Sequence, residues 1–343
     1  MTEQLSPLSV LSTKLCPWLQ PVLTRLDTAR TAGRLGHAWL LAGPRGIGKI
    51  NVALVFANRL LRGIPEAVQP PQLGAEEAVA AMRERHAAAD HHPDLHWLFP
   101  EEDKRTISID QVRAVSEALA LTAHRGAAKV VVIEPADVMT TAAANALLKT
   151  LEEPSGDTYL LLVSHQPERL PATIRSRCQR LSIARPRPAD VIAWLGESEA
   201  ANISALWVST GGSPLEAAEF TTGLNININN SLEDKLILIS NDKIDPQSVA
   251  DEWFKLDREF VLSWLTRRIQ LSIRGRMAPN PSNPVTDLRV DALHNAWGAL
   301  TLRRLFDQHQ AAERLLDQLG AGINVELALR ALLLGFKPNR GQP

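Results

Sequence analysis

The first half of the chain alternates between short apolar runs and segments with helical periodicity. Residues 130–133 form a β-branched run that ends at an acidic position, as expected of a strand buried on both faces of a parallel sheet. Apolar residues then recur at helical spacing after two N-cap candidates, Thr140 and Thr141, until Pro154 ends the helix. Residues 159–163 form a second buried run. This alternation predicts a parallel sheet with a polar site at the carboxyl edge of its strands.

The same alternation extends back to the start of the chain. The predicted elements there are a helix within 15–35, a strand at 37–42, and helices at 51–61, 76–89 and 111–122. The segment at 62–96 is polar and contains several proline and glycine turn signals, so we interpret it as an insertion.

After residue 183 the pattern becomes helical. Residues 185–188 have the composition of a linker, and the helices predicted next lie at 189–195, 203–210 and 214–220. The Asn-rich segment at 225–230 predicts a connector, and the chain is helical in pattern from 231 onward. Three domains are therefore predicted: 1–184, 185–226 and 227–343. The aromatic positions Trp253, Trp264 and Trp297 fit either a helix-bundle core or a subunit interface, and both interpretations stay open.

Composition narrows the class of protein. The chain has 343 residues, of which 45% are hydrophobic, and its 37 basic and 38 acidic residues give a formal net charge of −1. Any contact with nucleic acid must therefore come from a local patch. Two cysteines are too few for a disulfide framework. The N-terminus lacks the pattern of a secretory signal, and no apolar run is long enough to span a membrane, so we expect a soluble cytoplasmic protein.

A phosphate-loop pattern follows the strand predicted at 37–42. The candidate binding residues are Gly43, Gly46, Gly48 and Lys49. The glycines permit a tight loop whose N–H groups surround phosphates at a helix N-terminus, and the lysine adds a positive charge. The next position normally carries a Ser or Thr that binds Mg²⁺, but here it is Ile50. The pattern predicts either a degenerate nucleotide site or a loop retained only as a packed turn.

Four histidines in the insertion, His86, His91, His92 and His96, suggest a metal site at first sight. His92 and His96 have the spacing of two ligands on one helix face, but Pro93 interrupts any helix between them. We therefore expect no metal.

A second candidate surface precedes the helix predicted at 111–122. Arg105, Thr106 and Ser108 combine a positive charge and hydroxyls with a helix N-terminus, a combination that can hold a DNA phosphate. The segment fits equally well a surface turn with Asp110 as the helix N-cap.

Several motifs resemble the AAA+ clamp-loader family. They are the run NALLKTLEEP at 145–154, Ser176-Arg177-Cys178, His92-Pro93-Asp94 and Gly322-Ile323-Asn324. The resemblance implies an α/β fold in which an AAA+ P-loop parallel-sheet domain is followed by a small three-helix lid and a C-terminal all-α collar. It also implies that the strand ending at Glu134 supplies the acids of an ATP site.

The chain departs from the pattern of active members of this family. Glu134 is followed by Pro135 where an active motor has a catalytic Glu, and residues 211–215 lack the arginine of the lid motif. Four-cysteine zinc modules are frequent in the family, but the insertion contains no cysteine, so we expect no zinc and no nucleotide cofactor beyond a vestigial one. The resemblance also implies that Arg177 acts as an arginine finger in trans, rather than as part of a solvated basic stripe.

The resulting hypothesis is a stator subunit of a clamp loader. Such a subunit would be an accessory of a DNA-directed DNA polymerase, without ATPase activity of its own, and would help load a sliding clamp on primed DNA. The implied partners are delta and gamma/tau subunits in a hetero-oligomeric ring, the clamp, and primer-template DNA in a shared channel, with no membrane. An active motor ATPase of the gamma/tau type is the alternative, and a scaffold unrelated to replication is a third possibility.

Overall fold

The computed structural model describes residues 7–83, 92–101, 104–121, 128–196, 210–221, 224–277, 288–319 and 324–337. The chain divides into two compact units. Unit 1 contains residues 1–195 with 213–218, and unit 2 contains 196–212 with 219–343. The division into three domains stays a prediction, and the helix predicted at 203–210 lies almost wholly outside the described residues.

Unit 1 is built on five parallel strands in the order β2-β3-β4-β1-β5. The strands are β1 (Ala38–Ala42), β2 (Leu95–Leu98), β3 (Ala128–Ile133), β4 (Asp157–Ser164) and β5 (Gln179–Ser182). In register, Ala42 of β1 lies beside Ser164 of β4, and Ile133 of β3 lies beside Leu162 of β4. The carboxyl ends of β1, β3 and β4 therefore meet at one edge, where the chain continues into the predicted site.

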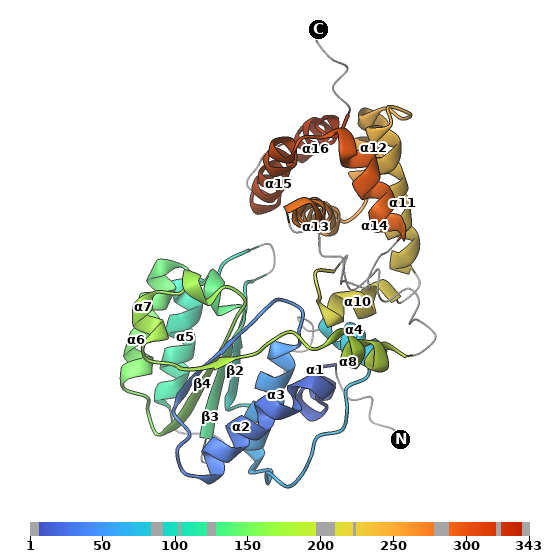
Figure 1. Cartoon of the computed structure of the whole chain (residues 1–343). Helices are drawn as coiled ribbons and strands as arrows, with labels where there is room; N and C mark the ends of the chain where they lie inside the picture. Colours follow the sequence, from blue (N-terminus) through green and yellow to red (C-terminus); the bar gives the residue numbers. More distant parts are fainter. Residues whose placement is uncertain are drawn as a thin grey trace. The chain divides into compact units, whose positions relative to one another are not determined.

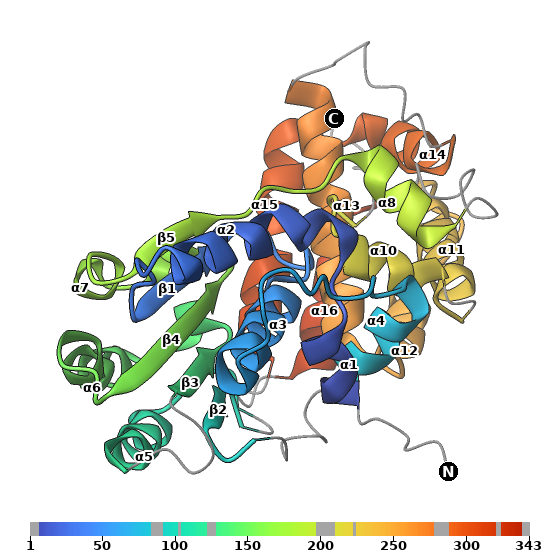
Figure 2. The same cartoon turned by 90° about the horizontal axis from the view of Figure 1, so that it is seen from below.

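Helices cover both faces of this sheet (Figures 1 and 2). On one face α2 (Gln20–Thr31) and α3 (Lys49–Arg62) share a core with alternate strand residues such as Leu41 and Val132, and α1 (Pro7–Thr13) joins this core by packing against α3. On the other face α5 (Ile109–Ala120), α6 (Thr141–Glu152) and α7 (Ala172–Arg175) pack over the intervening residues, among them Leu40 and Val131. Burial on both faces explains why β1 and β3 are continuous apolar runs rather than alternating ones.

Side-chain caps fix where two of these helices begin. The Thr140 hydroxyl accepts a hydrogen bond from Ala143 N at 3.1 Å, so Thr140 is the N-cap of α6. Ser108 caps α5 in a capping box with Gln111. The alternative that Asp110 is the N-cap is therefore wrong. Ser108 is the N-cap because it lies directly before the first helical turn, whereas Asp110 already lies inside that turn.

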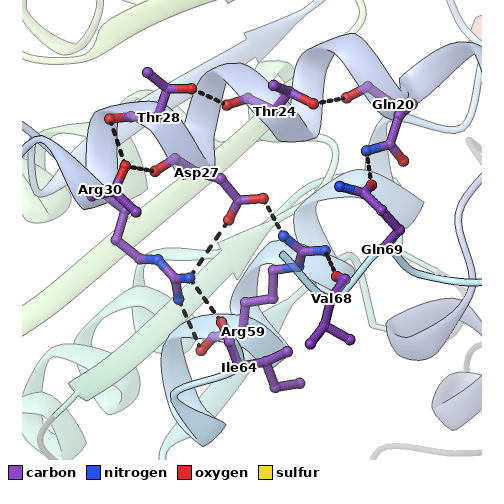
Figure 3. Close-up of polar contacts among 10 residues, drawn as sticks. Gln20, Thr24, Asp27, Thr28, Arg30, Arg59, Ile64, Val68 and Gln69 are labelled. Atoms are coloured by element: carbon purple, nitrogen blue, oxygen red, sulfur yellow. Dashed lines mark hydrogen bonds and ion pairs between the residues drawn. The ribbon is translucent and has the colours of Figure 1, made fainter. Parts of the chain in front are cut away.

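A buried polar cluster joins α2, α3 and the start of the insertion (Figure 3). Asp27 of α2 and Arg59 of α3 form an ion pair with almost no exposed surface. Arg59 Nη2 also donates to the Val68 carbonyl at 2.5 Å, and Arg30 Nη2 donates to the Ile64 carbonyl at 2.7 Å. The two arginines thereby supply hydrogen-bond donors to backbone carbonyls of the insertion, whose short helix α4 (Ala75–Arg83) follows.

The remaining elements of unit 1 are short. They are three 3₁₀ turns, η1 (Pro17–Leu19), η2 (Ala136–Val138) and η3 (Pro167–Arg169), the helix α8 (Pro188–Leu195), and the start of α10 (Pro214–Thr221), which continues into unit 2.

The described part of unit 2 is helical (Figure 1). Its helices are α11 (Leu224–Ser240), α12 (Pro246–Trp253), α13 (Arg258–Met277), α14 (Leu288–Ala296), α15 (Leu302–Asp317) and α16 (Val325–Leu334), with the 3₁₀ turn η5 (Trp297–Ala299). The side chains of Trp253, Trp264 and Trp297 are all buried in its core. The sequence had left their role open, and in this chain they pack the bundle. The predicted α/β fold class with a helical C-terminal part is confirmed.

The predicted connector at residues 225–230 is wrong, because these residues lie within α11. Asparagine has a modest helix propensity, but tertiary packing overrides it here. Asn229 is buried, and its side-chain oxygen accepts a 2.6 Å hydrogen bond from the Trp264 indole of α13.

Candidate functional site

The phosphate loop connects β1 to α3 at the carboxyl edge of the sheet. Gly46 and Gly48 have φ values of 73° and 81°, in the left-handed region that favours glycine. At Gly43 an added Cβ would lie 2.3 Å from the Ile183 carbonyl oxygen, so this position accepts no side chain. The three glycines of the motif are therefore required by the loop conformation itself.

Lys49 is buried and its amine is turned back onto its own loop. Nζ donates to the carbonyl oxygens of Gly43 and Pro44 at 2.7 and 2.6 Å, and lies 2.8 Å from His165 Nδ1. Burial lowers the pKa of Lys49 to about 8, although the charge of Glu134 acts in the opposite direction. The group that would neutralise a phosphate is thus already engaged with three acceptors of this chain.

Three residues that follow β3 or β4 in the chain complete this edge of the sheet. Glu134 follows β3 and is buried. His165 follows β4, and its backbone N–H donates to the Asp137 carboxylate at 2.8 Å. The sequence motifs indicate Glu134 but not the contacts made by His165 and Asp137. The available signal was their position just after buried strands, although only the strand order shows that β4 lies next to β1.

Other segments of unit 1 cover the loop. The Trp18 indole donates to the Ile47 carbonyl at 2.9 Å, and Leu215 N donates to the Gly46 carbonyl at 3.1 Å. The Ser213 hydroxyl lies so close that a Cβ at Gly46 would be only 1.8 Å away from it. Two loop carbonyls therefore already have partners from distant parts of the chain. No sequence signal pointed to Trp18, whereas Ser213 and Leu215 belong to the lid motif noted above.

The residues present fit a magnesium nucleotide poorly. Ile50 is 2% exposed and belongs to the apolar core shared by α1, α2 and α3, so its side chain supplies no metal ligand. Pro135 offers no base to activate water. Among the described residues no group of three His, Cys, Asp or Glu side chains is placed to hold a metal ion. His86 and His91 lie outside those residues, while His92 Nδ1 accepts a hydrogen bond from Asp94 N.

Ser164 ends β4 at the same edge, beside Ala42 of β1. It is fully buried, and within the described parts of the chain its hydroxyl has no hydrogen-bond partner.

Arg177 lies at a different place from the loop residues, in the turn between α7 and β5. Its Nη1 donates to the Thr173 carbonyl at 3.0 Å, and its Nη2 forms an ion pair with Glu152, the last residue of α6. The side chain is 36% exposed. These contacts leave Arg177 on the surface, where a second molecule can reach it, and do not join it to Lys49.

The three candidate DNA contacts precede α5. Arg105 and Thr106 are exposed, whereas Ser108 is half-buried and its hydroxyl serves the capping box. The backbone between them is fixed, because Ile107 N donates to the Val138 carbonyl at 3.1 Å. The segment therefore presents one cation and one hydroxyl outward, and its third residue is already used by the helix.

Among the described helices none is long and apolar enough to cross a membrane.

Comparisons with known proteins agree with the motifs. A family model described as DNA polymerase III, delta subunit, matches residues 18–187. DNA polymerase III subunit delta′ of Pseudomonas aeruginosa is 43% identical over 207 residues, which is 59% of this chain and 60% of that protein. The protein of the same name from Escherichia coli is 39% identical over 199 residues, which is 57% of this chain and 58% of that protein. The one from Bacillus subtilis is 38% identical over 173 residues, which is 50% of this chain and 49% of that protein.

The matches therefore span between about half and three fifths of these relatives. They confirm the resemblance to the delta prime-like clamp-loader family over the part of the chain that they cover.

Proposed function

We propose that this chain, whose residues 18–187 match a family model described as DNA polymerase III, delta subunit, is a non-hydrolysing clamp-loader subunit. It occupies a hetero-oligomeric ring with delta and gamma/tau subunits in the cytoplasm and donates Arg177 in trans to a neighbouring ATP site. The ring loads a sliding clamp on primed DNA during replication.

The observation that supports this role is a contrast between two sets of residues: those of the chain's own phosphate loop are engaged or apolar, whereas Arg177 is exposed to a neighbouring molecule. The loop lysine is engaged by the chain's own acceptors, and Ile50 occupies the position of the Mg²⁺ ligand. Arg177, in contrast, is a surface cation. Transfer of a phosphoryl group spreads negative charge over its oxygens, and an arginine supplied from a neighbour stabilises it, typically by about 10³–10⁵ in rate. Such a chain would assist ATP hydrolysis in the site of a neighbouring subunit and would not hydrolyse ATP itself.

Contacts with primer-template DNA are part of the proposal. Arg105 and Thr106 supply a cation and a hydroxyl suited to a backbone phosphate. Because the formal net charge of the chain is −1, this local segment contributes only a part of a channel shared with other subunits.

The first test measures Mg-ATP binding and turnover by the isolated chain. We expect neither to approach the level of an active motor. Turnover at motor-like rates would favour the alternative, an active gamma/tau-like ATPase, for which the glycine conformations of the loop are the supporting observation.

The second test places Arg177→Ala in the reconstituted ring. ATP turnover should fall while the ring still assembles. The matched control is Arg175→Ala, which removes an exposed arginine from the last turn of α7 and should leave turnover unchanged. Equal turnover in the wild-type and Arg177→Ala rings would contradict the finger, and equal loss in both variants would indicate a general electrostatic effect.

A further inference from the structure

Arg177 is not a loose surface side chain, because two acceptors from different elements hold its guanidinium. One is the Thr173 carbonyl of α7, 3.0 Å from Nη1, and the other is the carboxylate of Glu152 at the end of α6, paired with Nη2. The guanidinium has five N–H groups in a planar fork, and these two contacts use two of them. The group is therefore restrained at both terminal nitrogens while it retains donors for a third partner.

The ion pair has little value for folding. The side chains of Arg177 and Glu152 are 36% and 48% exposed, and ion pairs this open to water contribute little to stability. Glu152 is also poorly placed for its own helix, because the last turn of a helix disfavours negative charge. Because the contact adds so little to stability, its main effect is to restrict the orientation of the Arg177 guanidinium.

We infer that Glu152 is a positioning residue for Arg177. Its carboxylate, together with the Thr173 carbonyl, orders the guanidinium so that its remaining N–H groups can meet a phosphate carried by a neighbouring subunit. A free arginine would lose most of its rotamer freedom when it binds an anion, and part of that loss has already occurred here. The inference rests on the proposed function, since it concerns the same arginine.

The carboxylate also competes with an incoming phosphate for the cation, so the two effects must be compared. The fork can donate to both anions at once from different edges, and a phosphate group with more than one negative charge is the stronger acceptor. Ordering of the side chain therefore outweighs competition, and loss of Glu152 should slow hydrolysis rather than accelerate it.

The experiment introduces Glu152→Ala and Glu152→Gln into the full-length chain of the reconstituted ring and measures kcat and KM for Mg-ATP. Glu152→Ala should lower kcat by about threefold to tenfold, because a misplacement of about 1 Å can cost about 100-fold and the loss of one of two restraints should displace the guanidinium by less. KM should change little, because the neighbour's own loop binds the nucleotide. The kcat of Glu152→Gln should lie between those of the wild type and Glu152→Ala, because the glutamine amide oxygen still accepts a hydrogen bond but carries no charge. Unchanged or raised kcat in both variants would overturn the inference.

Two controls separate this inference from the proposed function. Glu153→Gln removes the adjacent exposed acid, which pairs with no cation in the described structure, and should leave kcat unchanged. In an Arg177→Ala background, Glu152→Ala should have no further effect, because Glu152 acts through the arginine. A further drop would contradict that route. If Arg177→Ala alone leaves turnover unchanged, the proposed function fails. If Arg177→Ala lowers turnover and the Glu152 variants do not, only the role of Glu152 fails.

Discussion

At the scale of single residues, the lysine of the phosphate-loop motif, Lys49, makes hydrogen bonds within its own loop. Its amine bonds the carbonyls of Gly43 and Pro44 and contacts His165, so it closes the loop on itself. These bonds offset part of the free-energy cost of burying a cation, but the lowered pKa of about 8 indicates that a cost remains.

The first prediction concerns the pH dependence of stability that this lysine produces. Its pKa is about 8 in the folded chain, against an ordinary value of 10.5, so between these values the folded state binds fewer protons than the unfolded state. Stability therefore rises with pH in that window. Relative to Lys49→Met, the wild-type free energy of unfolding should increase by about 1 kcal/mol from pH 7 to pH 9. Urea denaturation of both chains at both pH values measures these free energies. A difference between wild type and Lys49→Met that stays constant from pH 7 to pH 9 would contradict the prediction.

The sequence located those site residues whose signal is local. Gly46, Gly48 and Lys49 follow from the spacing of one loop, and Thr140 follows from its place before a helical pattern. Trp18 and His165 could not be found in this way, because their contacts with Ile47 and Lys49 span 29 and 116 positions of the chain. Only the strand order and the path of the N-terminal segment bring these groups together.

At the scale of elements, the start of α6 depends on one hydroxyl. Thr140→Ala removes the acceptor for Ala143 N and should lower the free energy of unfolding by about 1 kcal/mol. Thr141→Ala is the matched control. It changes an exposed residue in the first turn, where alanine is the better helix former, and should be neutral or slightly stabilising. Denaturant titration of both variants tests the assignment, and equal losses would mean that Thr140 is not the cap.

A second prediction at this scale concerns the contact between α11 and α13. Asn229→Ala removes the acceptor of the buried Trp264 indole and leaves that donor without its partner. The expected loss is about 1–3 kcal/mol. Ser231→Ala changes an exposed neighbour on the same helix and should alter stability little. Thermal unfolding followed by circular dichroism measures both, and a neutral Asn229→Ala would show that another acceptor can replace the amide.

The same asparagine explains why the sequence pattern does not predict this helix. An Asn-rich segment between helical patterns has the composition of a connector, because asparagine competes with the helix through local hydrogen bonds. The energy that favours α11 comes instead from partners 35 or more positions away, Trp264 and Arg268, and from apolar burial of residues such as Leu232. Elements of unit 1 were easier to predict because their buried strands are continuous apolar runs.

At the scale of the whole molecule, each unit has a hydrophobic core of its own. Unit 1 packs its helices on the two faces of the sheet, and unit 2 packs its helices around Trp253, Trp297 and Phe336. Domains with separate cores can in principle unfold separately. A defect placed deep in one unit therefore tests whether stability is shared between them.

Asp27→Ala provides such a defect in unit 1. It leaves the buried guanidinium of Arg59 without its carboxylate, and an unpaired buried charge costs about 3–5 kcal/mol. Hydrogen exchange should therefore speed up in α2 and α3, while protection in α13 and α15 stays as in the wild type. Asp190→Ala breaks an exposed ion pair of the same residue types, with Arg187, and should change exchange in neither unit. Equal loss of protection in both units after Asp27→Ala would mean that they unfold as one cooperative body, since separate cores predict a response confined to the damaged one.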